Sequence, residues 1–404
     1  MSKQKILFIS NGHGEDLNAS EVLKALNIKY PDIKTAALPM VGEGNAYRKL
    51  GVDIIVPTLS LPSGGFVYMD KRQLLTDMQK GLLKLTWQQI KAARAFAKDC
   101  DLIFAAGDVV PLALARITAC PYTAFIVSSS AHYENRMQPP FFMNWLMRSP
   151  LCKTIFTRDA FTAKLMQQQS ISKAIFAGYP IMDVLEPTQV NLELKPELPM
   201  IALLPGSRLP EASQNLGLML DLAVAIALEF APNQVQFRAA LVPKMMELDV
   251  LGAIALGHGW SFDPPHRFFH NQLDHLEITC YCNAFADILH KSNLVIGMAG
   301  TAVEQAVGLG KPIIQVLGQG PQFTYAFAEA QMRLLGISVQ TIGQTAATPS
   351  ILKEAAHKVK LTLQNSEYIK ACQANGTERV GLAGGSTRIA DRLAKLVQML
   401  KGSE

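Results

Sequence analysis

A glycine, a serine and an arginine follow one another at the end of a strand-like run in the second half of the chain. Gly206, Ser207 and Arg208 come directly after the apolar residues 200–204 and Pro205. At the tip of a strand they would expose backbone N–H groups, a hydroxyl and a guanidinium, which are the donors that a diphosphate requires. The motif therefore predicts a diphosphate-binding loop. The alternative is an ordinary strand-to-helix turn with an arginine at the surface.

A second turn of this kind connects the strand-like residues 294–297 to a helical pattern. It contains Gly300, Thr301 and Ala302, with Glu304 in the first helical turn. Glycine lets the backbone approach a phosphate, and a helix N-terminus supplies N–H groups and a favourable dipole. Glu304 can accept hydrogen bonds from ribose hydroxyls, or it can form a capping box with Thr301. Together the two turns favour a nucleotide-sugar diphosphate as ligand.

Two titratable side chains beside glycines are candidates for proton transfer. His13 stands between Gly12 and Gly14 after the first strand-like run, and Asp108 follows a glycine after another. An imidazole or carboxylate at a strand tip can take a proton from an acceptor hydroxyl. His13 can instead bond to the backbone, and Asp108 can either be the base or orient His13. The next candidates are Glu15 and Asp16.

Two apolar stretches in the first half are candidates for a surface that contacts a membrane. One contains Phe141, Phe142, Trp145 and Leu146 next to Arg148. The other, residues 59–69, contains Pro62, Gly64, Gly65, Phe66 and Tyr68. An exposed apolar patch beside a basic residue fits a bilayer from which a lipid acceptor is taken. The alternative is a buried helix and an ordered loop.

The alternation of apolar runs and helical patterns predicts two α/β units with parallel sheets. In the first unit, strands are expected at 6–9, 33–38, 53–56, 102–105, 123–127, 154–157 and 174–177, and helices at 19–26, 72–98 and 160–168. In the second unit, strands are expected at 200–204, 235–241, 276–280, 294–297 and 313–316, and a helix at 212–230. Ligands of doubly wound sheets bind beyond the carboxyl ends of the strands, where the candidate loops fall.

Proline content and periodicity also indicate the domain boundaries. We expect a Rossmann-like domain at 1–184, a proline-containing linker at 185–199 and a second Rossmann-like domain at 200–385. A final helix within 386–404 would pack back on the first domain.

Composition excludes several classes of protein. The chain has 404 residues, 49% hydrophobic and 18% charged, which excludes intrinsic disorder. A net charge of +5 is compatible with phosphate ligands or an anionic membrane but too small to indicate nucleic-acid binding. The six cysteines include no Cys-x-x-Cys pair, as expected of unpaired thiols in a reducing cytosol. Without a signal-peptide core or an apolar run of about 18 residues, we expect a cytoplasmic protein whose membrane contact is peripheral.

The sequence resembles the lipid A disaccharide synthase family and, more distantly, the peptidoglycan N-acetylglucosaminyltransferase. The resemblance spans most of the chain. It is carried by Leu-Pro-Gly-Ser-Arg at 204–208, Gly-Thr-Ala-Val-Glu at 300–304, Lys-Pro-Ile-Ile at 311–314, Gln-Phe-Thr at 322–324 and Phe-Ala-Gly-Tyr-Pro-Ile-Met-Asp at 176–183. It implies the GT-B fold, in which two Rossmann-like domains face each other across a cleft.

The resemblance also implies a donor site. Arg208 and Ser207 would meet the diphosphate, and Thr301 the phosphate nearer the sugar. Glu304 would hold the ribose, and the backbone around Phe285 to Leu289 would receive uracil. The remaining donor-site residues would be Gly206, Gly300, Ala302 and Gln322. No metal ion or other cofactor is expected, because Arg208, backbone amides and a helix dipole would stabilise the leaving group.

The first half departs from the family. Its loop 11–16 reads Asn-Gly-His-Gly-Glu-Asp where lipid A disaccharide synthases have a Gly-Glu-Ala-Ser-Gly-Asp type of loop. It looks more like the Gly-Gly-His loop of the peptidoglycan enzyme and of galactolipid synthases. Gly12 and Gly14 would lie on the acceptor side, and Asp108 sits one residue later than the family's candidate catalytic aspartate. The acceptor is therefore expected to differ.

These observations predict an inverting glycosyltransferase. It would move N-acetylglucosamine or a derivative from a UDP-sugar to a lipid-linked hydroxyl, peripherally at the inner leaflet of the cytoplasmic membrane, without a nucleic-acid partner. One alternative is an enzyme like the UDP-N-acetylglucosamine 2-epimerases, which would need acidic residues at the sugar's second carbon and no apolar patch. Another is a non-catalytic UDP- or lipid-binding protein of the same fold. The oligomeric state stays open.

Overall fold

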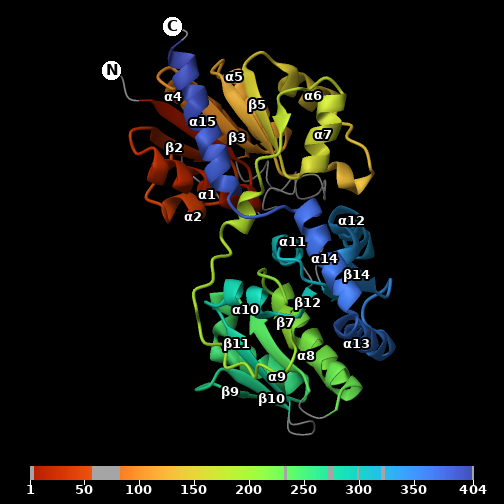
Figure 1. The fold of residues 1–404 in the computed structure, drawn as a ribbon. Helices are drawn as coiled ribbons and strands as arrows, with labels where there is room; N and C mark the ends of the chain where they lie inside the picture. The colour runs from red at the N-terminus through yellow and green to blue at the C-terminus, as the bar shows by residue number, and fades with distance from the viewer. Residues whose placement is uncertain are drawn as a thin grey trace. The chain divides into compact units, whose positions relative to one another are not determined.

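The computed structural model describes residues 4–56, 82–231, 234–271, 276–297, 300–319 and 324–402. The chain divides into two compact units (Figure 1). Unit 1 comprises Met1–Asp183 and Leu382–Glu404, and unit 2 comprises Val184–Gly381. The expected apolar segment 59–69, residues 72–81 of an expected helix and Gln322 lie outside the described residues.

The sheet of unit 1 is parallel throughout. Its strands are β1 (Lys5–Ser10), β2 (Lys34–Pro39), β3 (Leu102–Gly107), β4 (Tyr122–Ile126), β5 (Cys152–Thr157) and β6 (Ala174–Ile175), in the order β2-β1-β3-β4-β5-β6. The central strand β3 is buried along its whole length, as a parallel strand covered on both faces should be. The chain runs outward from β1 in one direction and from β3 in the other, so the switch point of this sheet lies between their tips.

One expected strand of unit 1 is wrong. In residues 53–56, only Ile54 makes an isolated bridge, to Ala37 of β2. Two backbone hydrogen bonds join the segment to Ala37. Because Asp53 is exposed and the segment lies beyond the edge strand, it has too little apolar surface to bury for a longer pairing.

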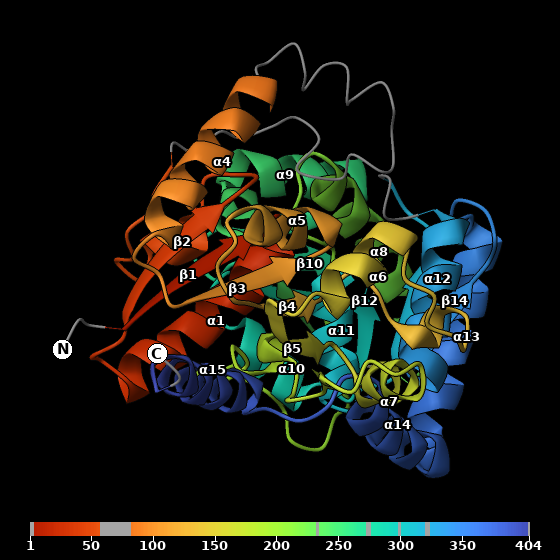
Figure 2. The ribbon, with the colours of Figure 1, turned by 90° about the horizontal axis from the view of Figure 1, so that it is seen from above.

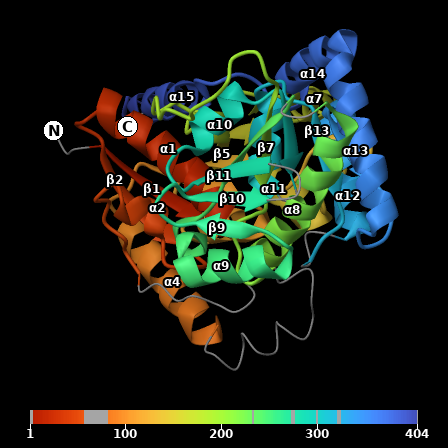
Figure 3. The same cartoon turned by 90° about the horizontal axis from the view of Figure 1, so that it is seen from below.

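Helices cover both faces of this sheet. They are α1 (His13–Lys29), α2 (Asn45–Arg48), α4 (Leu82–Ala97), α5 (Val109–Ile117), α6 (Phe141–Arg148), α7 (Ala160–Gln168) and α15 (Gly385–Lys401), with short 3-10 turns at Ala131–Tyr133 and Pro180–Met182. α4, α5 and α6 lie on one face, and α1 and α15 on the other (Figure 2). The C-terminal helix α15 runs beside α1 (Figure 3), and its Asp391 accepts hydrogen bonds from Lys29 and Tyr30, both at 2.9 Å.

The sheet of unit 2 is larger and has an antiparallel edge. Its strands are β7 (Met200–Leu204), β8 (Gln236–Ala240), β9 (Ser261–Asp263), β10 (Phe268–Asn271), β11 (Leu276–Tyr281), β12 (Leu294–Gly297), β13 (Ile313–Val316) and β14 (Val339–Ile342). Their order is β14-β13-β12-β7-β8-β11-β10-β9, in which β10 pairs antiparallel with both β9 and β11. The switch point lies between β7 and β12.

The helices of unit 2 are α8 (Glu211–Glu229), α9 (Leu248–Gly257), α10 (Phe285–Lys291), α11 (Gly300–Gly308), α12 (Tyr325–Leu335), α13 (Pro349–Gln364) and α14 (Ser366–Arg379), with 3-10 turns at Pro243–Met246 and Gly336–Ser338. α8, α9 and α13 pack on one face of the sheet, opposite α10 and α11.

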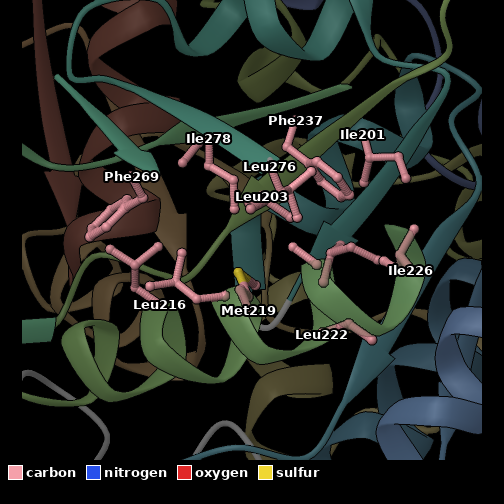
Figure 4. Close-up of a cluster of buried hydrophobic side chains, with 14 of the residues drawn as sticks. Ile201, Leu203, Leu216, Met219, Leu222, Ile226, Phe237, Phe269, Leu276 and Ile278 are labelled. Atoms are coloured by element: carbon pink, nitrogen blue, oxygen red, sulfur yellow. The ribbon is translucent and has the colours of Figure 1, made fainter. Parts of the chain in front are cut away.

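A hydrophobic core joins α8 to the sheet of unit 2. Leu216, Met219 and Ile226 of α8 face Phe237 of β8 and Ile278 of β11 (Figure 4). Burial of each such side chain contributes about 1.5–3 kcal/mol. α8 is long and apolar enough by composition to cross a membrane, but half of its most apolar stretch is buried in unit 2. Its apolar character is therefore accounted for by packing on the sheet.

The segment 185–199 lies on unit 2 without forming a helix or strand. Asp287 of α10 accepts hydrogen bonds from Thr188 and from the backbone N–H of Gln189. The guanidinium of Arg238 donates to the carbonyls of Leu192 and Glu193. These bonds fix the segment to the unit that follows it.

Candidate functional site

The tips of β1 and β3 bring Asn11 and Asp108 together at the switch point of unit 1. Asn11 Nδ2 donates to Asp108 Oδ1 at 2.8 Å, and so does the backbone N–H of Val110, because Asp108 caps α5. Gly107 has φ +137°, and a Cβ there would lie 2.2 Å from Asn11 Oδ1. Glycine is thus required beside the carboxylate, both for its backbone conformation and for the approach of Asn11.

Burial raises the pKa of Asp108 above its ordinary value, and the hydrogen bonds from Val110 and Asn11 offset part of that rise. A carboxylate with a raised pKa binds a proton more strongly than an exposed one. It is therefore a better general base near neutral pH.

His13 is the first residue of α1, directly after the N-cap residue Gly12. Its backbone therefore lies at the tip of β1, beside the Asn11–Asp108 pair, while its side chain falls outside the described part of the chain. Gly14 follows in the first turn, where a Cβ would meet no atom within 4 Å. The structure thus brings the loop of His13 and Asp108 to one edge, as the sequence predicted from their strand ends.

Asp16 is buried beneath this loop and is not available to a substrate. Ser10 Oγ donates to Asp16 Oδ1 at 2.5 Å, and the hydroxyls of Ser10 and Tyr47 are 2.6 Å apart. Burial is the main cause that raises the pKa of Asp16 to about 7. Sequence reasoning missed this Ser10–Asp16–Tyr47 network, because Tyr47 comes from α2 and nothing in the local pattern links it to β1.

An aromatic surface is exposed on α6. Phe141, Phe142 and Trp145 are 86%, 50% and 48% exposed, and we call them the α6 surface. The rings of Phe142 and Trp145 stack at 5.7 Å, and the guanidinium of Arg116 lies 5.5 Å from the Trp145 ring. The expected buried-helix alternative therefore does not hold for these three side chains.

Leu146, which was expected on the same surface, is fully buried, so that expectation is wrong. Helical geometry explains it, because Met143, Leu146 and Met147 share the opposite face of α6 and pack in the core of unit 1. Arg148 is exposed, but its guanidinium donates to the carbonyls of Gln169 and Ser170. It thereby secures α6 to the end of α7.

The helices on this face of unit 1 carry charge of one sign. α4, α5 and α6 contain Lys91, Arg94, Arg116 and Arg148 and no aspartate or glutamate. Trp87 of α4 is also 67% exposed. The face therefore combines basic side chains with exposed aromatic rings.

In unit 2, the two glycine turns lie at the tips of the adjacent strands β7 and β12. Gly206 has φ +107° and is followed by Ser207 and Arg208, both exposed, before α8 begins. Gly300 has φ +39°, with open space where a Cβ would be, and it begins α11. The turns therefore flank the switch point, where ligands of doubly wound sheets bind.

Thr301 lies inside the first turn of α11, and Ala302 and Glu304 follow it there, half-buried. A capping box would need Thr301 to precede the helix as its N-cap residue, whereas α11 begins one residue earlier, at Gly300.

The expected uracil site falls on α10. Phe285 is the first residue of this helix and is half-buried. The α10 ladder begins with the bond from Ile288 N–H to the carbonyl of Ala284, so the amide of Phe285 is one of the helix-terminal donors. Leu289, in contrast, is fully buried in the middle of the helix. Within the described residues, no group of three or more His, Cys, Asp or Glu side chains is arranged to hold a metal ion.

No protein-family model matches the chain, and no curated protein matches its sequence. The fold does resemble solved structures. CalG4, the calicheamicin glycosyltransferase, has a TM-score of 0.60 at 15% identity, over 98% of this chain and 99% of that one. MurG from Acinetobacter baumannii has 0.57 at 14% identity, over 97% and 99%. UDP-GlcNAc 2-epimerase from Neisseria meningitidis, bound to UDP-GlcNAc, has 0.57 at 13% identity, over 97% and 100%.

At such low sequence identity these similarities establish the fold alone. The chain has the GT-B fold, with two parallel-sheet α/β domains, which confirms the expected fold class.

Proposed function

We propose that the protein is an inverting glycosyltransferase, related to the lipid A disaccharide synthases, that moves a sugar from a UDP-sugar to a lipid-linked hydroxyl. One observation carries the proposal. The turns at Gly206 and Gly300 follow adjacent strands at the switch point of unit 2, where they would supply the donors that a diphosphate binds. The fold is compatible with this chemistry, since the neighbours include glycosyltransferases and a UDP-GlcNAc-bound epimerase.

Unit 2 would hold the donor. Arg208 and Ser207 would bind the diphosphate, the N-terminus of α11 with Gly300 and Thr301 would bind the phosphate nearer the sugar, and Glu304 would accept from the ribose hydroxyls. Gly206 and Ala302 would let the backbone come close, and the α10 N-terminus at Phe285 would receive the base. No metal cofactor is proposed, because the guanidinium and the helix amides would balance the charge of the departing UDP.

Unit 1 would supply the base. Asn11 and Val110 both bind Asp108 Oδ1, so Oδ2 is the oxygen we assign to the acceptor proton. The acceptor oxygen forms a bond to the anomeric carbon as the bond from that carbon to the UDP oxygen breaks, with inversion. The acceptor proton moves to Asp108, or to His13 if the imidazole is the base.

The acceptor-binding unit would bind peripherally to the cytoplasmic face of the membrane. The α6 surface exposes three aromatic rings on a face whose helices contain basic but no acidic residues. Such a combination favours anionic lipid headgroups and partial insertion of aromatic rings. It also favours a lipid acceptor over an epimerase reaction, which needs no second substrate.

The experiment that tests this function incubates the protein with UDP-N-acetylglucosamine, with and without extracted lipid, and identifies products by mass spectrometry. A glycolipid that forms together with UDP supports the proposal. A UDP-sugar epimer that forms without lipid would show an epimerase instead. UDP binding without any product would show a binding protein. Comparing the lipids of cells with and without the protein would then identify the sugar and the acceptor.

A further inference from the structure

Asn215 is a fully buried polar side chain on α8, the core helix of unit 2. The next residue, Leu216, and Met219 one turn on belong to the hydrophobic core. A buried amide costs free energy unless its donors and acceptor are used, whereas an apolar residue of similar size would carry no such requirement. The hydrogen bonds of Asn215 therefore indicate what this position does.

Those hydrogen bonds join two loops that are far apart in sequence. Asn215 Nδ2 lies 3.3 Å from the carbonyl of Pro205, in the loop after β7, and 3.5 Å from that of Gln319, in the loop after β13. The backbone N–H of Gln319 donates to Asn215 Oδ1 at 2.9 Å. One amide thus pairs with both backbone groups of Gln319 while it also holds the residue before Gly206.

The order of the strands shows where the two loops joined by Asn215 lie in the sheet. β12 lies between β7 and β13 in the sheet, and α11 begins beyond the tip of β12. Asn215 therefore ties together the loops on either side of the tip from which α11 starts. The Gly206–Arg208 turn continues the first of these loops, and α11 starts from the strand between them.

We propose that Asn215 is a positioning residue that fixes the separation of the β7 and β13 loops and so sets the width of the diphosphate site. It acts through the backbone of Pro205 and Gln319 and does not touch the ligand. An asparagine suits this position because one short side chain both donates and accepts. The identity of the ligand rests on the proposed function, whereas the coupling of the loops does not.

The test compares Asn215→Leu, which keeps the branched shape of the side chain but loses the hydrogen bonds, with Leu216→Ala, a matched variant that removes core packing from the neighbouring residue. Hydrogen exchange of the Gln319 amide is the first readout, because its N–H is bound directly to Asn215. We expect exchange about tenfold faster in Asn215→Leu at a temperature where both variants are folded. Leu216→Ala should lower the melting temperature without this local change. Unchanged Gln319 exchange in Asn215→Leu would overturn the proposal.

Binding of UDP and of inorganic pyrophosphate is the second readout. Asn215→Leu should weaken both about five- to tenfold, and Leu216→Ala should weaken neither. Equal affinity in Asn215→Leu and wild type, despite faster exchange, overturns the positioning role. If the wild type binds pyrophosphate but not UDP, the proposed function is wrong. The effect of Asn215→Leu on pyrophosphate affinity then tests the role of Asn215. Binding of neither overturns both.

Discussion

Two carboxylates with different degrees of burial lie close to the tip of β1, and their surroundings assign them different roles. Asp108 is only partly covered and reaches the edge of the sheet, whereas Asp16 is almost completely enclosed. Burial raises the pKa of both side chains. Only Asp108 can meet an acceptor. We therefore expect substitution of Asp108 to change proton transfer and substitution of Asp16 to change stability.

Asp108→Asn should lower turnover about 10²- to 10⁴-fold, because an amide cannot take the acceptor proton but can still cap α5. UDP affinity should stay unchanged, since the proposed diphosphate site lies in unit 2. In the wild type, turnover should fall as the pH falls through the raised pKa of Asp108, because a protonated carboxyl is no base. Turnover and calorimetric UDP binding are measured in parallel. If Asp108→Asn keeps near-normal turnover while His13→Ala loses it, the imidazole is the base.

Asp16→Asn should change how stability depends on pH. The folded protein binds the Asp16 proton with a pKa of about 7, against 3.8 for an unperturbed side chain. The folded state is therefore favoured below pH 4, and this advantage is lost as the pH rises through 7. Relative to the variant, the wild type should lose about 2–3 kcal/mol between pH 5 and pH 8. Denaturant unfolding of both proteins at the two pH values measures it, and parallel pH profiles would refute the assignment.

Arg208→Ala should weaken UDP binding by about 1.5–3 kcal/mol, the range for a lost charge-assisted hydrogen bond. Arg208→Lys should lose less, since it keeps the charge but not the planar fork of donors. Arg267→Ala is a control, because Arg267 is exposed in the turn between β9 and β10, at the far edge of the sheet. Titration calorimetry with UDP compares the three variants. Equal losses for Arg208→Ala and Arg267→Ala would mean that general charge, and not this loop, attracts the ligand.

At the scale of elements, α6 has one face packed in the core of unit 1 and one face exposed. Replacing Phe142 and Trp145 with serine should release the protein from anionic liposomes, because it removes the stacked rings that would enter the bilayer interface. UDP affinity should not change. The control replaces Leu228 and Leu256 with serine, since these side chains are equally apolar and 73% and 84% exposed but lie in unit 2. Flotation with vesicles is the measurement. Loss of folding in the α6 variant, or equal release by the control, would contradict a specific membrane surface.

The elements best predicted from the sequence are those whose pattern is complete within a few residues. β12, β13 and α7 begin and end where the sequence predicts, because buried parallel strands are continuous apolar runs and α7 has regular helical spacing. The hairpin of β9 and β10 and the edge strand β14 were missed, since short edge strands carry polar residues and give little periodicity. Such strands are held by their neighbours in the sheet.

In the candidate site, too, only the residues with a local sequence signal could be predicted. Gly206 and Gly300 could be found because glycine at a strand end is a local signal. The partners of Asn11 and Asn215 could not, because Asp108 and Gln319 are 97 and 104 residues away in the sequence. Only the strand order brings them together.

At the scale of the whole molecule, both units place their candidate residues in the same way. In each, the chain continues across the sheet in opposite directions from two paired parallel strands, and the loops beyond their tips carry the candidate chemistry: Asn11 and Asp108 in unit 1, and Gly206 and Gly300 in unit 2. A bond-forming reaction between two substrates can thus be divided between two sheets. Donor binding and proton transfer should accordingly respond to different mutations.

A ligand that binds unit 2 should stabilise that unit by mass action. Of the three tryptophans in the chain, Trp260 is buried in the core of unit 2, while Trp87 and Trp145 are exposed in unit 1. In a Trp87→Phe, Trp145→Phe protein, fluorescence therefore reports the unfolding of unit 2 alone. UDP at about 100 times its Kd should stabilise this transition by about 2.7 kcal/mol. At the same UDP concentration, the gain in Arg208→Ala should be smaller by nearly the binding free energy that this variant loses, since the gain depends on the logarithm of the affinity. Denaturant titration followed at Trp260, with and without UDP, measures the shift. Asp108→Asn in the same background should leave the UDP-dependent shift intact, because that carboxylate lies in unit 1. If calorimetry shows that UDP binds while the Trp260 transition does not shift, the UDP site is not on unit 2 and the assignment of the donor to that unit is overturned.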